Sequence, residues 1–162
     1  MTPATTSNTA RSPAEVYRRG YCSSGRRWGL YRSDIVDPTG APYMRRWILA
    51  FAGWMVRLHH IQKADAGRCP HDHPFDFVSV VLRGGYREER VVVSASGDTA
   101  TTWETRRAPG VAYRRAEDLH RLVSVEPGTW TLVLTGPIRR MWGFLLPDGR
   151  WVDFLTYMRE NE

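Results

Sequence analysis

Apolar residues in this chain recur mostly at alternate positions or in short runs, and glycine or proline interrupts them roughly every ten residues. Neither a strand–helix–strand alternation, nor a nucleotide-binding glycine-rich loop, nor an internal repeat is present in the sequence. Short strands punctuated in this way are typical of antiparallel sandwiches and jelly rolls. The pattern therefore predicts an all-β fold with strands at 28–35, 43–51, 54–61, 77–83, 86–94, 100–106, 111–115, 120–125, 129–135, 140–145 and 150–155.

The N-terminal part of the chain has a different composition. Residues 1–11 are mostly Thr, Ser, Ala and Asn, which order poorly unless they dock on something. The motif Ser12-Pro13-Ala14-Glu15 has the form of a capping box with proline at the first helical position, which predicts a short helix ending near Tyr21. We expect residues 1–40 to form a tail and helical extension, and residues 41–162 to form one β-barrel domain.

The segment from Cys69 to Tyr86 carries the most informative chemistry. His71 and His73 stand two residues apart, just before an apolar run that ends at a double glycine. Residues two apart in a strand share a face, so both imidazoles can reach one ion. Neutral imidazole is the commonest protein ligand for zinc, iron, copper and nickel. The chain has five histidines, and His120 is the candidate for a third ligand.

Alternation along the same segment sorts its other residues. If the strand is regular, Phe77 and Ser79 share the face of the two histidines, whereas Asp72 and Asp76 lie on the other face. Asp76 could ligate a metal only if Pro74 introduced a bulge, so we expect it to pair with one of the many arginines. Cys69 is expected to be a small buried residue, with a thiol near the metal as the alternative.

His59 and His60 are adjacent at the end of a strand, so only one of them can face the interior. For each we expect a hydrogen-bonded histidine beside the core, with orientation of a metal ligand as the functional alternative. A metal site beside an arginine suits a carboxylate, because the guanidinium group binds it through two hydrogen bonds. The residues nearest the metal segments that could bind or activate a substrate are Arg57, Arg83, Arg115, Tyr86 and Tyr113, and we take Tyr113, Arg115 and Arg57 as the catalytic candidates.

Composition limits the possible partners. The net charge is +6, but all except one of the 23 basic residues are arginine and they are dispersed, so a nucleic-acid surface is not expected. No apolar stretch is long enough to span a membrane and the first residues are polar, which favours a cytoplasmic location. Cys22 and Cys69 are not expected to form a disulfide there. Exposed edge strands and many aromatic residues make a homodimer plausible.

The order of these motifs resembles the two halves of the cupin signature, over about residues 55–145. The first half is the pair His71 and His73, an apolar strand and Gly84, and the second half is the stretch from Gly110 to His120. The family also has a glutamate in its first half, and counting back from Gly84 places that position at Phe77. The second half here is one residue short and lacks the family's proline and glycine. The resemblance implies a cupin-like antiparallel β-barrel, or double-stranded jelly roll.

Loss of the glutamate with all three histidines kept is similar to the thiol dioxygenases of the cysteine dioxygenase type, as are the His-Asp-His tripeptide and the strand that follows His120. This resemblance implies one divalent metal held by His71, His73 and His120, with Fe(II) favoured and Zn, Ni or Mn possible. It also implies a mononuclear non-haem Fe(II) oxygenase that uses O2 on a small polar substrate. Two alternatives stay open: a redox-neutral metal-dependent lyase, isomerase or hydrolase, and a non-catalytic small-molecule-binding cupin without metal.

Overall fold

The structure, a computed structural model, describes residues 28–36, 42–65, 69–94 and 96–160. Every ladder between neighbouring strands is antiparallel. The described elements are β1 (Trp28–Val36), β2 (Pro42–Phe51), β3 (Trp54–Ile61), β4 (Phe77–Arg83), β5 (Gly85–Val93), β6 (Thr99–Arg107), β7 (Gly110–Arg114), β8 (Leu119–Val125), β9 (Thr129–Thr135), β10 (Gly143–Leu145), β11 (Trp151–Asp153) and α2 (Phe154–Glu160).

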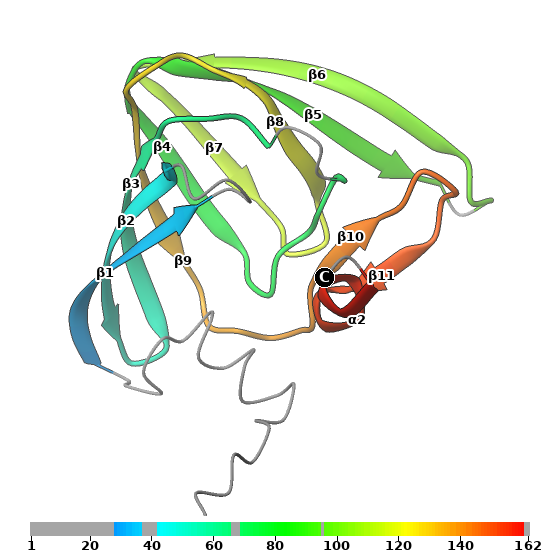
Figure 1. Cartoon of the computed structure of the whole chain (residues 1–162), viewed down its shortest axis with the longest axis horizontal. Helices are drawn as coiled ribbons and strands as arrows, with labels where there is room; N and C mark the ends of the chain where they lie inside the picture. The colour runs from blue at the N-terminus through cyan, green and yellow to red at the C-terminus, as the bar shows by residue number, and fades with distance from the viewer. Residues whose placement is uncertain (1–27, 37–41, 66–68, 95, 161–162) are drawn as a thin grey trace, which may run out of the picture.

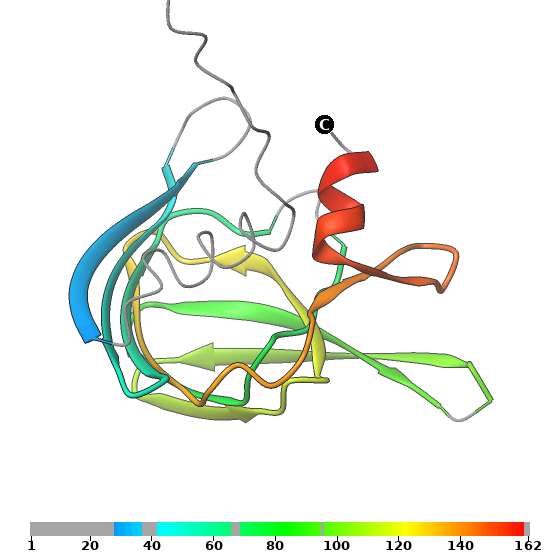
Figure 2. The ribbon, with the colours of Figure 1, turned by 90° about the horizontal axis from the view of Figure 1, so that it is seen from below.

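The strands form two main sheets and a hairpin. The larger sheet has six strands in the order β1-β2-β3-β9-β4-β7, and a second sheet has the order β6-β5-β8. The strands β10 and β11 pair with each other, and α2 lies beside them (Figure 1). Among the described residues no ladder joins the two main sheets, so they form an open jelly roll rather than a closed barrel (Figure 2). The expected all-β antiparallel fold is confirmed.

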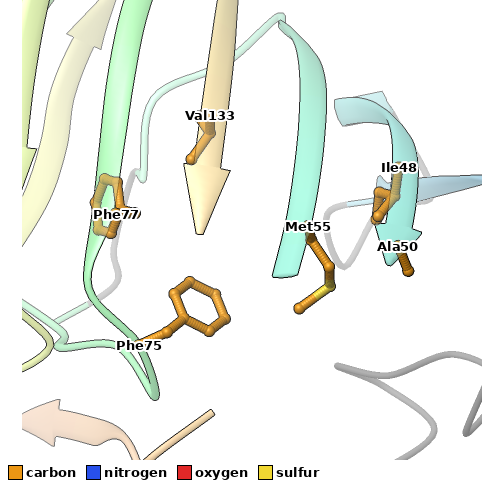
Figure 3. Packing of buried hydrophobic residues seen from close by; sticks show 6 residues of the cluster. All are labelled: Ile48, Ala50, Met55, Phe75, Phe77 and Val133. Atoms are coloured by element: carbon orange, nitrogen blue, oxygen red, sulfur yellow. The ribbon is translucent and has the colours of Figure 1, made fainter. Parts of the chain in front are cut away.

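The apolar core lies at one end of the larger sheet. Six side chains from β2, β3, β4, β9 and the loop before β4 pack there, as Figure 3 shows: Ile48, Ala50, Met55, Phe75, Phe77 and Val133. Alternation places them on the inner face of their strands, and each is no more than 9% exposed. Burying an aliphatic or aromatic side chain of this size stabilises the fold by about 1.5–3 kcal/mol. This cluster packs next to the histidine segment, where the Phe77 ring contacts that of His73.

Most strand boundaries agree with the sequence prediction to within one or two residues, but the C-terminal region does not. The strands predicted at 140–145 and 150–155 are the shorter β10 and β11, and α2 was not predicted. Asp153 caps this helix, because its Oδ1 accepts hydrogen bonds from the backbone nitrogens of Leu155 and Thr156 at 3.1 and 3.2 Å. The helix has only seven residues, which is too short for the apolar repeat by which helices are usually detected.

The first described strand belongs to the larger sheet. The strand β1 pairs along its whole length with β2, so residues 28–36 are part of the six-stranded sheet. The sequence analysis had assigned them to the extension. The helix predicted between Ser12 and Tyr21 lies outside the described residues. The division of the chain at residue 40 stays a prediction.

The double glycine after β4 has a clear steric reason. Gly84 has φ +72°, and a Cβ there would stand 2.6 Å from the Thr129 Oγ1 atom. Thr129 itself is fully buried and accepts a hydrogen bond from the Gly85 nitrogen at 3.1 Å. The tight turn thus fixes β4 and β5 against the start of β9. No helix within the described ranges is long and apolar enough to cross a membrane.

Candidate metal centre

Three imidazoles converge between the two sheets. One ring nitrogen from each of His71, His73 and His120 lies within 4.8 Å of the others. The Nε2 atoms of His73 and His120 are 2.7 Å apart. Two nitrogens that each lie about 2.1 Å from one ion at right angles are about 3 Å apart. The donor set and its spacing therefore fit one small divalent metal ion.

Backbone hydrogen bonds bring these distant segments together. His71 and His120 form an isolated antiparallel bridge, in which each backbone nitrogen donates to the other residue's carbonyl oxygen at 2.9 Å. The nitrogen of His73 donates to the carbonyl oxygen of Ala116, also at 2.9 Å. The His71–His73 segment is thus fixed to the strand β8 and the loop before it, and the imidazoles need no metal to meet.

The aspartate between the two histidines anchors the segment from behind. Asp72 is only 2% exposed and points away from the imidazoles. Its carboxylate accepts hydrogen bonds from the Gly143 nitrogen at 2.6 Å, from Arg140 at 2.5 Å and from the Trp151 indole at 2.9 Å. Gly143 must be a glycine here, because a Cβ would meet the carbonyl oxygen of Val152 at 2.1 Å. The β10–β11 hairpin therefore serves as a support for the candidate metal segment.

Asp76, the other carboxylate in the segment, holds the loop rather than facing the histidines. It accepts hydrogen bonds from the Ala116 nitrogen at 2.7 Å and from Arg139 at 2.6 Å. The Arg139 hydrogen bond is the main cause that lowers the pKa of Asp76. The expectation that Asp76 pairs with an arginine is confirmed.

Phe77 stands where the cupin signature has its glutamate. Its ring is 9% exposed and lies edge-on to His73, with centroids 4.8 Å apart, and 6.2 Å from the His120 ring. The predicted register of this strand is thus correct, since Phe77 faces the histidines. An aromatic ring offers no ligand atom, so the imidazoles are the candidate protein ligands on this side.

A buried carboxylate on β5 orients one of the imidazoles. Glu88 is 2% exposed and lies 2.6 Å from His120 Nδ1. An Nδ1–H donated to Glu88 leaves the lone pair on Nε2, which points toward His73 and the candidate metal position. Arg114, from β7, donates two further hydrogen bonds to Glu88, at 3.1 and 2.5 Å. Burial alone raises the pKa of Glu88, but the bonds from His120 and Arg114 outweigh it and lower this pKa to about 2.

Glu88 and Arg114 are functional candidates that the sequence pattern did not indicate. The run from Tyr86 to Arg90 has the dense charge of a half-exposed strand, yet Glu88 and Glu89 are buried. Glu89 pairs with Arg121 on the neighbouring strand β8. Alternation along the strand could have indicated that Glu88 is buried. Tyr86 has a largely apolar side chain that suits the interior, and Glu88, two residues later, shares its face.

The imidazole of His73 is held in its neutral, metal-binding form. Burial lowers the pKa of His73 well below its usual value, and the charges of His120, His71 and Arg57 lower it further. A neutral imidazole keeps a lone pair for a metal, whereas an imidazolium does not. The site is thereby kept ready for a cation near neutral pH.

The imidazoles open into a cavity of about 140 Å³ between the sheets. Its charged residues are two arginines and two carboxylates: Arg57, Arg114, Glu88 and Asp65. Arg57, on β3, is 6% exposed, and its guanidinium carbon lies 4.8 Å from the centre of the Phe75 ring. Asp65 accepts hydrogen bonds from the Tyr43 hydroxyl and, at 2.8 Å, from the Leu122 nitrogen. Both carboxylates are thus engaged with protein donors, and the cavity has room for a small molecule only.

The remaining sequence candidates divide between the two sides of the sheet. His59 lines the cavity, and its Nε2 atom is buried with no hydrogen-bond partner among the described residues. Burial, with the charges of Arg57 and Arg46, lowers the pKa of His59 well below its usual value. His60 points to the other side, where its ring stacks on Trp130 at 4.6 Å. Only one of the two adjacent histidines faces inward, as alternation predicted.

The structure does not bring the three catalytic candidates together. Arg57 and Tyr86 line the cavity, whereas Tyr113 is 57% exposed and Arg115 is also exposed, and neither lines it. The strand β7 buries Ala112 and Arg114 instead, so alternation turns Tyr113 outward. Arg83 is exposed at the end of β4, and Cys69 is half-buried outside the cavity lining.

No family model matches the chain, and no curated protein matches it in sequence. Solved structures do match its fold. HppE in its FeII form superposes with a TM-score of 0.52 at 7% identity, covering 69% of this chain and 61% of HppE. Streptomyces albus HEPD, solved with its substrate 2-hydroxyethylphosphonate and Fe(II) bound, gives 0.52 at 15% identity, covering 82% of this chain and 27% of HEPD. The Momordica charantia 7S globulin gives 0.49 at 17% identity, covering 78% and 35%.

This chain thus spans 61% of the length of HppE and 27% of that of HEPD. At these identities the likeness concerns the fold alone. It agrees with the cupin-like architecture that the histidine pattern predicted.

Proposed function

We propose that the chain binds one metal ion through His71, His73 and His120. We further propose that it acts as a non-haem Fe(II) oxygenase on a small anionic substrate. The convergence of three imidazoles on one point in a cavity between the sheets carries this proposal. A divalent ion held by three protein ligands keeps coordination positions open, where it can bind substrate and O2 together. The two iron-containing structural neighbours support iron by analogy of fold.

The charge of the cavity supports an anionic substrate. The two lining arginines and the two lining carboxylates balance one another. A divalent metal among neutral imidazoles would therefore leave the cavity with two positive charges. Charge buried without compensation is costly, so binding of an anion with one or two negative charges is favoured.

Arg57 is the residue that we assign to this anion. Arg114 is already committed to Glu88 and Glu104, with N–O distances of 2.5 and 3.1 Å. Arg57 is held over the Phe75 ring on the inner face of β3, in the row that includes the cavity-lining His59. Its planar guanidinium group suits a carboxylate or phosphonate, and His59 can offer a hydrogen bond through its buried Nε2.

The test begins with protein purified without added metal, followed by elemental analysis. Iron-loaded protein is then mixed with aminothiols, thiocarboxylates and 2-hydroxyethylphosphonate, and O2 uptake is measured beside uncharged analogues of each. We expect substrate-dependent O2 uptake with an anionic compound and little with its uncharged analogue. A sulfinate product would assign the thiol dioxygenase subclass. Protein that retains zinc or nickel and shows no O2 uptake with any compound would contradict the oxygenase and favour a redox-neutral lyase or isomerase.

A matched pair of arginine variants tests the substrate assignment. Arg57→Leu should raise KM for the anionic substrate by about 10- to 100-fold or more, because a charged hydrogen bond contributes about 1.5–3 kcal/mol. Metal content should stay unchanged. Arg57→Lys should recover part of the loss, and Arg83→Leu, at an exposed position outside the cavity, should behave as the wild type. Equal KM values for Arg57→Leu and Arg83→Leu would contradict the role of Arg57.

A further inference from the structure

The strand β9 places its polar and apolar residues on unexpected sides. Thr129, Thr131 and Thr135 point inward, and each is at most 2% exposed. Leu132 and Leu134 point outward and are 37% and 41% exposed. A sheet with one solvated face normally turns its apolar residues inward and its polar residues outward. The inversion in β9 indicates that its outer side is covered in the functional protein.

The other strands of the six-stranded sheet also turn apolar residues outward, although their inner face carries the apolar core as well. Strand pairing aligns outward-facing residues into two parallel rows that run from strand to strand. The first row runs from β1 to β7 through Leu30, Leu49, Val56, Leu134, Val78 and Tyr113. The second runs from β2 to β7 through Trp47, Leu58, Leu132, Val80 and Val111. We call these two rows the outer apolar face.

The outer apolar face is strongly exposed at its edges and centre. Leu30 and Val111 are 76% and 64% exposed, and Leu49 is 47% exposed. Six strands about 4.8 Å apart, crossed by two rows about 6.6 Å apart, project roughly 380 Å². Monomeric proteins rarely expose a contiguous apolar patch of more than a few hundred Å². This projection is about half of the roughly 800 Å² that one partner contributes to a standard interface, and protruding side chains add accessible area to it.

The composition of this face selects the kind of partner. Neither row contains a charged residue, and the only ionic residue in register with them is Arg32, which pairs with Asp34 at 2.6 Å. Nucleic acid and anionic lipid would require a cationic face. A peptide strand would add to an edge through backbone hydrogen bonds rather than to a face. A second apolar sheet face is the surface that fits, since two such faces pack about 10 Å apart with interlocking side chains.

We propose that two copies of this chain dimerise through the outer apolar face, around a two-fold axis near Leu132. The strands β3 and β9 occupy the middle of the sheet order, so an axis there lets each row of one copy meet a row of the other. Tyr113 then has a role at the rim of this interface instead of in catalysis. The proposal does not depend on the metal, because the cavity lies on the opposite face of the same strands.

Sedimentation of the full-length chain at micromolar concentration tests the proposal. The wild type should sediment as a dimer. Leu132→Glu buries one carboxylate from each copy, and we expect the dimer dissociation constant to rise at least about 100-fold. Val92→Glu is the matched control, because Val92 is 56% exposed on β5 of the other sheet. It should leave the dimer intact.

Circular dichroism melting establishes that each variant is folded. Tyr113→Asp, at the rim, serves as a milder variant and should weaken the dimer by about 10-fold even if Leu132→Glu fails to fold. A wild type that is monomeric at all concentrations would overturn the proposal and assign the cover to another segment or partner. A folded Leu132→Glu variant that still dimerises as tightly as the wild type would also overturn it.

Discussion

The two faces of the six-stranded sheet carry residues of different kinds. The inner face carries the polar residues Arg57, His59 and Thr131 beside the apolar core at Phe77. These residues line a cavity. The outer face presents leucine, valine and tryptophan to its surroundings. The inner face thus combines the apolar core with polar groups that line a cavity. The apolar residues of the outer face are exposed in the single chain, and association would bury them as well.

Removing one imidazole should give the largest effect, and it tests whether the cavity beside the inner face holds a metal. His71→Ala, His73→Ala and His120→Ala should each lower metal content to near zero, because each loses one of three ligands. Elemental analysis after dialysis measures this. Asp76→Asn and Leu132→Glu, which lie outside the triad, should retain wild-type metal content. Full occupancy in His120→Ala would contradict the three-histidine assignment.

The ionic support of the inner face should appear in acid stability. The pKa of Glu88 is lowered to about 2 from its usual 4.5, so its stabilising contribution is present above about pH 4.5 and is lost as pH falls toward 2. The shift corresponds to about 3 kcal/mol of unfolding free energy. Denaturant unfolding of metal-free protein between pH 5 and 2.5 measures it. Glu88→Gln should show a shallower loss with falling pH.

The dependence of unfolding free energy on pH is compared between the wild type and Glu88→Gln. The difference between the two slopes gives the contribution of Glu88 alone, apart from the other acids of the chain. Glu104→Gln provides the control, because Glu104 is more exposed and touches the network only from its edge through Arg90, Arg106 and Arg114. Its slope should lie closer to that of the wild type. Parallel slopes for the wild type and Glu88→Gln would show that Glu88 does not carry the expected ionic stabilisation.

A carboxylate introduced on the inner face should change the preference for the metal. Phe77→Glu places an acid beside His73 and His120, where the cupin signature has its glutamate. Affinity for the hard ion Mn²⁺ should rise relative to that for Zn²⁺, measured by competition titration. Phe77→Leu controls for the loss of the aromatic ring. Unchanged Mn²⁺ affinity would mean that position 77 does not reach the ion.

The smallest effect is expected on the outer face. Tyr113→Phe removes only a hydroxyl from a side chain that is 57% exposed. Unfolding free energy should change by no more than about 0.5 kcal/mol, and metal content and turnover should not change. A large loss of turnover in this variant, with folding intact, would return Tyr113 to the catalytic candidates and blur the distinction between the two faces.

Local sequence determined the strands and the side of each residue within a strand. Alternation alone correctly placed Phe77 toward the histidines, Asp76 away from them, and only one of His59 and His60 inward. These inferences succeed because the side-chain period of a strand is a property of the backbone. The same local rule could not decide the absolute side for β7, so Tyr113 and Arg115 were chosen over the buried Arg114.

Tertiary structure decided which charges became buried and where the apolar surplus went. Nothing local distinguishes Glu88 from an exposed acid, because its burial depends on Arg114 and His120 arriving from other strands. The meeting of His120 with His71 and His73 likewise depends on a backbone bridge between distant segments. The rows of the outer face arise only from the register of six strands. The sequence by itself determines the alternation of side chains within each strand. Which residues of different strands meet depends on how the strands pair, and both the candidate metal centre and the outer apolar face are formed by residues of different strands or segments.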